Sequence, residues 1–423
     1  MSKERALRAA MGTAVALRVV LALVAWRSHG TTAFLAVDSA TYLAPAMSIA
    51  THGAFENANG QAELFRTPGY PLLLAFGLIA GHPLLVPLAT QVLLSALLVA
   101  LTYALARELF DERAARLCAW IAAIEPTMLL WSVKLMPETL FTCALVAFVY
   151  AAIRALATRD ARWTLASALA LCAAIYVKPI AYPLAFVVVL AALFVTARHA
   201  LVFLAMCMLL LAPWHVRNYA RARYAGFTTL MDHAVYLSAG GSVAARQQHE
   251  SFVAMRQRML ADAARIDGPA RYATMRRDGL ALVRTDPFGY ARTHVAGMLR
   301  TLFDPGAVEY ARLFGAYPEN GGALAGIVDR GLARGALAFA RARPALFAAA
   351  LALALLLAPL VLLPLLGIAR DRRVPLVFVA LVVAYLVVAS GGVPGSSRFR
   401  APMVPLLALL SGAALRDRVT LQN

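Results

Sequence analysis

Two residues of opposite charge stand in the first polar stretch of the chain. Asp38 follows a long apolar run almost directly, and Arg66 opens a second polar segment 28 positions later. If the apolar run crosses a membrane, both residues lie at the outer mouth of a helix bundle. A carboxylate that accepts a proton, beside a guanidinium that holds an anion, predicts chemistry at the membrane surface.

More charged residues occur near the ends of later apolar runs. The charge pattern described below places them on the same side of the membrane as Asp38 and Arg66. Cations there would stabilise negative charge that develops on a departing lipid phosphate, while a carboxylate takes a proton from the attacking group. Each also has a structural alternative. The long cationic side chains would anchor helix ends at the interface, Asp38 would cap a helix over 39–49, and Glu138 would cap its own helix. A further functional role for Glu138 is that of a ligand for a divalent cation. The catalytic candidates are Asp38 and Glu138, and the phosphate-binding candidates are Arg66, Lys134, Lys178, Arg217, Arg398 and Arg400.

Lys134 and Glu138 flank a Met-Pro pair and stand four residues apart. This spacing predicts that they share one helix face, despite the proline. Lys3, Lys134 and Lys178 are the only lysines in the chain, which makes the two internal ones notable.

The composition is that of a polytopic membrane protein. Of the 423 residues 61% are hydrophobic, and the mean hydropathy is +0.71. A soluble core does not need so many long apolar runs. The net charge of +18 therefore indicates topology first and an anionic partner second, and we expect no nucleic-acid partner. The four cysteines fall inside apolar runs, so we interpret them as buried apolar residues.

About ten apolar runs are long enough to span a bilayer. The run at 71–80 is too short, and we interpret it as an interfacial or re-entrant helix. Leaving it out places the arginine clusters of later loops on the cytoplasmic side, together with a retained first span and a cytoplasmic N-terminus. The predicted spans are 7–26, 84–106, 115–133, 138–154, 163–178, 180–197, 199–214, 344–369, 374–390 and 400–415.

Three parts follow from this topology. Residues 1–214 form an N-terminal membrane catalytic module that includes a first outer loop at 27–83. Residues 215–343 carry mixed charge and form an outward-facing, mostly helical segment, with helices over 251–266 and 270–284 and another starting at Pro287. Residues 344–423 form the C-terminal membrane helices. The fold class is all-α.

Arg18 and Glu125 lie deep inside predicted spans. Isolated charges near mid-membrane are costly, so both side chains should face the bundle and find partners. We expect them to pair with each other. The alternative is that each uses other polar groups or that Arg18 reaches the interface.

The order of these short motifs resembles the membrane glycosyltransferases of the C-type fold. The likeness is strongest to the dolichyl-phosphate-mannose protein mannosyltransferases and the bacterial lipid A aminoarabinose transferases. It covers the whole membrane part and is most specific in the first 140 residues. The matching motifs are Asp38-Ser39-Ala40-Thr41-Tyr42, Gly53-Ala54-Phe55, Arg66-Thr67-Pro68-Gly69-Tyr70-Pro71, Pro137-Glu138, Lys178-Pro179, Pro213-Trp214 with Arg217-Asn218, and Arg398-Phe399-Arg400 before Pro402.

The resemblance implies that Asp38 is the catalytic base and that an interfacial helix lies in the first outer loop. Tyr42 and Tyr70, in the first and third of these motifs, are assigned to the substrate-binding loop. The sequence departs from the family at Ser39, where a second acid often stands, and it lacks the relatives' additional soluble parts. These departures leave the acceptor open.

The function expected from residues and resemblance together is that of an inverting glycosyltransferase. It would move a sugar from a polyprenyl-phosphate carrier to a lipid, glycan or protein acceptor, in the cytoplasmic (inner) membrane with the site facing the periplasm. No cofactor is required by the sequence, and a divalent cation is left open. The alternatives are a transporter or flippase of an anionic lipid-linked substrate and a membrane scaffold. Charges deep inside spans and an internal repeat would favour transport, but the sequence has only two such charges and no repeat.

Overall fold

The chain is helical almost throughout. The structure is a computed structural model that describes residues 3–193, 197–318 and 332–415. Within these residues there is no β-strand, only an isolated bridge between Glu56 and Ala62. The all-α fold class predicted from the sequence is therefore confirmed for the described part of the chain.

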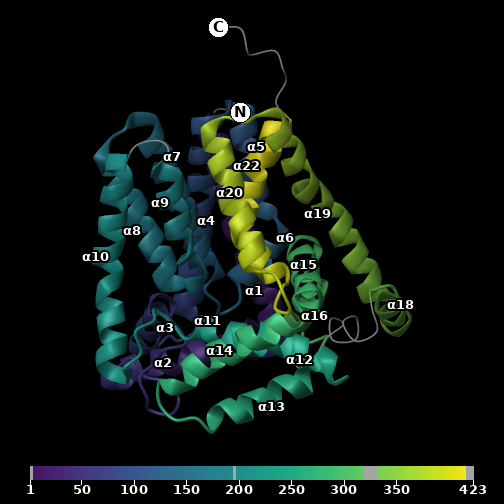
Figure 1. Cartoon of the computed structure of the whole chain (residues 1–423). Helices are drawn as coiled ribbons and strands as arrows, with labels where there is room; N and C mark the ends of the chain where they lie inside the picture. The colour runs from purple at the N-terminus through teal and green to yellow at the C-terminus, as the bar shows by residue number, and fades with distance from the viewer. Residues whose placement is uncertain (1–2, 194–196, 319–331, 416–423) are drawn as a thin grey trace.

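The long helices stand side by side in one bundle, and a layer of shorter helices crosses one of its ends (Figure 1). In the bundle α10 forms one flank, and α19 leans away on the other. The bundle helices are α1 (Lys3–His29), α4 (Leu85–Leu109), α5 (Glu112–Ile124), α6 (Pro126–Ser132), α7 (Glu138–Thr158), α8 (Ala161–Val177), α9 (Leu184–Leu193), α10 (Ala197–Ala222), α19 (Pro344–Arg370), α20 (Val374–Ala389) and α22 (Val404–Ala414).

Among the described residues, five helices are long and apolar enough to cross a membrane, namely α1 with the turn that follows it, α4, α7, α10 and α19. The pair α5 and α6, bent by 48°, makes a sixth candidate. The predicted number of ten spans is not confirmed in the described residues. Helices such as α8, with 17 residues, and α20, with 16, fall short of the roughly 20 residues that a span needs at about 1.5 Å per residue.

The bend between α5 and α6 has a chemical cause in Pro126, which lacks the N–H that would continue the helix. Two buried charges compensate for the break. Arg18 Nη1 donates to the carbonyl of Ala123 at 2.9 Å, and Glu125 accepts the N–H of Met128 at 2.7 Å as the N-cap of α6. The predicted ion pair between Arg18 and Glu125 is not among the ion pairs of the described residues. Each side chain instead satisfies a backbone group at the break.

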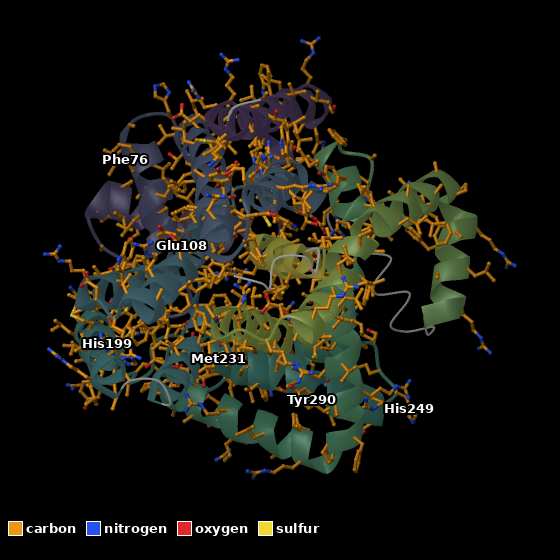
Figure 2. The ribbon with its side chains drawn as sticks, turned by 90° about the horizontal axis from the view of Figure 1, so that it is seen from above. Phe76, Glu108, His199, Met231, His249 and Tyr290 are labelled. Atoms are coloured by element: carbon orange, nitrogen blue, oxygen red, sulfur yellow. The ribbon has the colours of Figure 1, made fainter. Side chains whose placement is uncertain are left out.

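Residues 27–83, which the sequence predicts as the first outer loop, contain the helices α2 (Ser39–His52) and α3 (Gly69–Ile79). The predicted short helix at 71–80 is thus present as α3, with 11 residues. Phe76 on α3 lies at the outer edge of the molecule when the bundle is viewed along its axis (Figure 2), and it is 62% exposed. An exposed apolar side chain on a short helix fits an interfacial position.

The segment after α10 forms the layer that crosses the end of the bundle. The predicted helices are confirmed as α13 and α14, and Pro287 is the first residue of α15, where Asp286 accepts the N–H of Gly289 at 2.8 Å. The elements are α11 (Leu230–His233), the π-helix η3 (Ala234–Gly240), α12 (Gly241–Gln247), α13 (Phe252–Ala264), α14 (Ala270–Thr285), α15 (Pro287–Phe303), α16 (Ala307–Leu313) and α18 (Leu332–Ala342).

Short elements complete the chain at the points where charged residues gather. They are η1 (Gly30–Phe34), η2 (Pro179–Ala181), α21 (Ser397–Arg400) and η4 (Ala401–Met403).

Candidate active site

Five charged side chains from five separate segments meet in one network of ion pairs. Asp38 precedes α2, Arg66 precedes α3, Glu138 opens α7, Lys178 lies between α8 and η2, and Arg398 lies on α21. With two carboxylates and three cations, the network carries a formal charge of +1. All five were candidates from the sequence, and the structure brings them together.

Asp38 is the accessible carboxylate of the network, with 37% of its side chain exposed. Its Oδ2 lies 2.5 Å from Arg398 Nη1, and its Oδ1 lies 3.4 Å from Arg66 Nη2. Asp38 occupies the N-cap position of α2 but makes no side-chain capping bond. Burial raises its pKa, but the charges of Arg398 and Arg66 outweigh that effect, so the pKa lies below the usual value.

Glu138 is the enclosed carboxylate, with a side chain only 1% exposed. Its Oε1 accepts from Lys178 Nζ at 3.0 Å and from Arg398 Nε at 2.5 Å. Its Oε2 is buried and takes no hydrogen bond within the described residues. The carboxylate therefore lies behind the two cations and has no free path to a substrate hydroxyl.

Arg66 is held by side chains of α2 and by the neighbouring Phe65. Its Nε donates to Thr41 Oγ1 at 2.8 Å, and its Nη1 donates to the hydroxyl of Tyr42 at 3.0 Å. The guanidinium also stacks over the rings of Tyr42, at 4.2 Å, and Phe65, at 4.6 Å. These contacts leave the Nη2 edge directed at Asp38.

Tyr42 and Tyr70 stack edge-on with ring centroids 5.4 Å apart, and both are buried. The Tyr70 hydroxyl donates to Gln91 Oε1 at 2.8 Å, and Gln91 in turn donates to the carbonyls of Ser132 and Lys134. Tyr70 thus supports the site from below through the turn between α6 and α7. Its assignment to substrate binding stays a prediction, as does that of Tyr42.

Three other predicted phosphate ligands donate hydrogen bonds to backbone carbonyls. Lys134 Nζ donates to the carbonyl of Leu35 at 2.9 Å, and the Arg217 guanidinium donates to the carbonyls of Glu63 and Phe55, both at 2.6 Å. Arg400 donates to backbone carbonyls at the end of α15 and to Thr127. Such contacts stabilise loops. A role for these cations toward phosphate stays a prediction.

Lys134 and Glu138 do not share a helix face. Pro137 is the N-cap of α7, so Lys134 precedes the helix and the four-residue spacing has no geometric meaning here. Lys134 turns toward η1, whereas Glu138 turns toward Lys178 and Arg398.

Three residues that were not site candidates from the sequence contact the network, although Thr41 and Phe399 lie within the matching motifs. Thr41 holds Arg66, Trp131 lies under Arg398 at 5.9 Å, and Phe399 lies under Lys178 at 4.7 Å. Thr41 is three residues after Asp38 at the start of a predicted helix, a spacing from which its position near Asp38 could have been predicted. No sequence signal marked Trp131, which is buried with its indole N–H unpaired within the described residues.

Across the described residues, no group of three or more His, Cys, Asp or Glu side chains is arranged to hold a metal ion. The two carboxylates of the network are occupied by cationic side chains.

The family model described as dolichyl-phosphate-mannose-protein mannosyltransferase matches residues 66–216. This stretch contains Arg66, Glu138 and Lys178, whereas Asp38 and Arg398 lie outside it. The resemblance that the motifs indicate is confirmed over this stretch. Comparison with curated proteins gives no significant match.

Several solved structures are similar to this chain at low sequence identity. The archaeal oligosaccharyltransferase AglB from Archaeoglobus fulgidus, in complex with an inhibitory peptide and a dolichol-phosphate, is 12% identical, with a TM-score of 0.46 over 95% of this chain and 50% of that chain. The apo form of the oligosaccharyltransferase of the same organism is 14% identical, with a TM-score of 0.48 over 94% of this chain and 50% of that chain. ArnT from Cupriavidus metallidurans, bound to undecaprenyl phosphate, is 17% identical, with a TM-score of 0.42 over 94% of this chain and 77% of that chain. The chain spans about half the length of the oligosaccharyltransferases that it matches.

Proposed function

We propose that this protein is an inverting membrane glycosyltransferase that takes a sugar from a polyprenyl-phosphate carrier. The observation that carries the proposal is the half-exposed carboxylate of Asp38, set against three cations in a network of net charge +1. The family whose model matches residues 66–216 is named for a dolichyl-phosphate-linked sugar donor, which supports this class of carrier.

In the proposed reaction the acceptor hydroxyl or amine attacks the anomeric carbon of the donor sugar. The bond between that carbon and the phosphate oxygen breaks, and its electron pair stays with the phosphate. Asp38 takes the proton of the attacking group, a role that contributes about 10²–10⁴ in rate in enzymes generally. Arg66, Lys178 and Arg398 stabilise the charge that develops on the phosphate.

Glu138 takes a different role from the one expected as a second catalytic acid. Because it is enclosed and paired with Lys178 and Arg398, it positions these two cations. We place the site at the outer face of the cytoplasmic membrane, because the arginine clusters of the other side then lie in the cytoplasm.

The proposal is tested by incubating the purified protein in detergent or nanodiscs with a panel of polyprenyl-phosphate sugars and with candidate acceptors. We expect release of polyprenyl phosphate from at least one donor. Asp38→Asn should reduce this release by a factor of at least about 10² while the protein stays monodisperse. Arg292→Gln, which changes an exposed arginine on α15, is the matched control. Full activity in Asp38→Asn would remove the proposed base.

A further inference from the structure

We propose that Arg398 is shared between Asp38 and the donor phosphate: the arriving phosphate draws the Nη edge of Arg398 away from Asp38, and this frees the carboxylate to act as base. The inference rests on the proposed function and adds a coupling between donor binding and the activation of the base.

The first support is the unequal enclosure of the two carboxylates that Arg398 bridges. Arg398 Nη1 contacts Asp38, whose side chain is 37% exposed, and Arg398 Nε contacts Glu138, whose side chain is 1% exposed. Lys178 holds Glu138 from a second direction. The Arg398 side chain is 13% exposed, and its accessible neighbour is Asp38, so an incoming anion would compete with Asp38 while Glu138 stays the fixed anchor.

The backbone that carries Arg398 is also fixed, so an exchange needs only a side-chain movement. The N–H of Ser397 donates to Asp304 Oδ2 at 2.8 Å, and Arg400 is buried against the carbonyls of Leu302 and Asp304. Arg300 donates to the carbonyl of Gly392 at 2.9 Å. These bonds clamp the segment around Arg398 onto the end of α15.

The chemistry of the guanidinium fits both partners. Its planar edge binds carboxylate and phosphate oxygens in the same fork geometry. A carboxylate engaged by two arginines has lower affinity for a proton than a free one, because the cations favour its charged form. Asp38 therefore becomes a better proton acceptor once Arg398 has turned to the phosphate.

The charges balance throughout the transfer. The network carries +1, and a phosphodiester-linked sugar carries −1. After transfer the freed phosphate carries −2, while the proton on Asp38 raises the network to +2. The sum is zero before and after the transfer, so the charge of the five residues is equal and opposite to that of a monophosphate-linked donor.

Two matched variants separate this exchange from a simple effect of net charge. Asp38→Asn and Glu138→Gln each remove one negative charge from the network. Undecaprenyl phosphate serves as the probe, and its affinity is measured by calorimetry or thermophoresis on the detergent-solubilised full chain, with Arg292→Gln as the control for folding.

The exchange predicts opposite shifts for the two variants. Asp38→Asn should bind undecaprenyl phosphate about tenfold more tightly than the unmodified protein, because the competitor for Arg398 is gone. Glu138→Gln should bind it more weakly, because Arg398 and Lys178 lose their anchor. If both variants bound undecaprenyl phosphate more tightly to the same extent, net charge alone would explain the change and the exchange would be wrong. An unchanged affinity of Asp38→Asn for undecaprenyl phosphate would also overturn the exchange.

A second measurement needs no variant, which covers the case in which Glu138→Gln fails to fold. The pH dependence of kcat/KM for the donor reports the free enzyme, and that of kcat reports the donor complex. The charged groups that face Asp38 are Arg398, Arg66 and Lys178. Only Arg398 changes partner, so the acid limb of kcat should lie at higher pH than the acid limb of kcat/KM. Coincident limbs would overturn the exchange.

The proposed function and the exchange at Arg398 can fail separately. If no donor in the panel releases polyprenyl phosphate and no variant binds undecaprenyl phosphate, the proposed function is wrong, and the exchange falls with it. If release occurs and the two acid limbs coincide, the function stands and only the exchange is wrong.

Discussion

Arg400 Nη2 donates a hydrogen bond of 2.6 Å to Thr127 Oγ1, which joins the segment before the last bundle helix to the start of α6. Its Nη1 reaches the carbonyls of Leu302 at 2.9 Å and Asp304 at 2.6 Å. The Arg400 side chain is fully buried. One guanidinium thus fastens the end of α15 and α6 to the short helix that carries Arg398.

Replacing the Arg400 guanidinium should destabilise the segments that carry the site without changing any member of the charge network. Arg400→Met removes the donor of three backbone carbonyls and of the Thr127 hydroxyl, so we expect the free energy of unfolding to fall by about 3 kcal/mol. The unfolding temperature in detergent measures this, with Arg292→Gln as the exposed control. An unchanged unfolding temperature would show that Arg400 does not hold these segments together.

The break between α5 and α6 gives a second prediction. Arg18→Glu and Glu125→Arg should each lower the expression and thermal stability of the protein. The double swap should not restore either, because Arg18 serves the carbonyl of Ala123 and Glu125 serves the N–H of Met128. Fluorescence-detected chromatography and thermal unfolding of the three variants give the measurement. Rescue in the double variant would show that the two charges act as a pair.

All five members of the charge network could be predicted as candidates from the sequence. Charged residues at the same ends of neighbouring apolar helices lie close together when those helices pack side by side. The sequence was not sufficient to separate Arg398 from Arg400. Residues two apart on a helix differ by about 200° in direction, so these neighbours face different partners. Arg398 reaches Asp38 and Glu138, whereas Arg400 reaches Thr127 and the end of α15.

The number of spans was harder to predict, because several apolar runs fold into helices too short to cross a membrane, such as α8 with 17 residues and α20 with 16. The run at 115–133 is one candidate span, but the structure bends it by 48° between α5 and α6. Pro126 marked this break in the sequence. The helices between residues 251 and 303 were predicted close to their observed positions. The start of α15 at Pro287 was predictable because proline at the first helical position is a local signal.

Close packing of α15 against the loop before Arg398 depends on a glycine. A Cβ at position 297 would collide with the backbone of Gly392. Gly297→Ala should therefore displace this loop, lower the stability by about 1–3 kcal/mol and reduce transfer. Gly12→Ala is the matched control, since a Cβ there meets nothing within 4 Å and alanine favours the helix by about 1 kcal/mol. Equal stability and activity in the two variants would contradict a close contact at Gly297.

The pH dependence of transfer should report the cations around Asp38. Burial raises the pKa of Asp38, but the charges of Arg398 and Arg66 outweigh burial and bring this pKa below the usual value. The base form of Asp38 therefore persists to lower pH than that of an ordinary carboxyl group. Arg66→Gln removes one of these charges and should shift the acid limb of kcat/KM to higher pH, by less than about one unit because Asp38 is partly exposed. The stability of the protein should depend on pH in the same direction. The contribution of Asp38 to stability is present above its unfolded pKa and is lost as the pH falls through the folded value, so Arg66→Gln should narrow the pH range of this loss.

Arg217→Gln is the control for both measurements, because Arg217 contacts the carbonyls of Glu63 and Phe55 rather than Asp38. If both variants moved the acid limb equally, the shift would not come from the ion pair with Asp38.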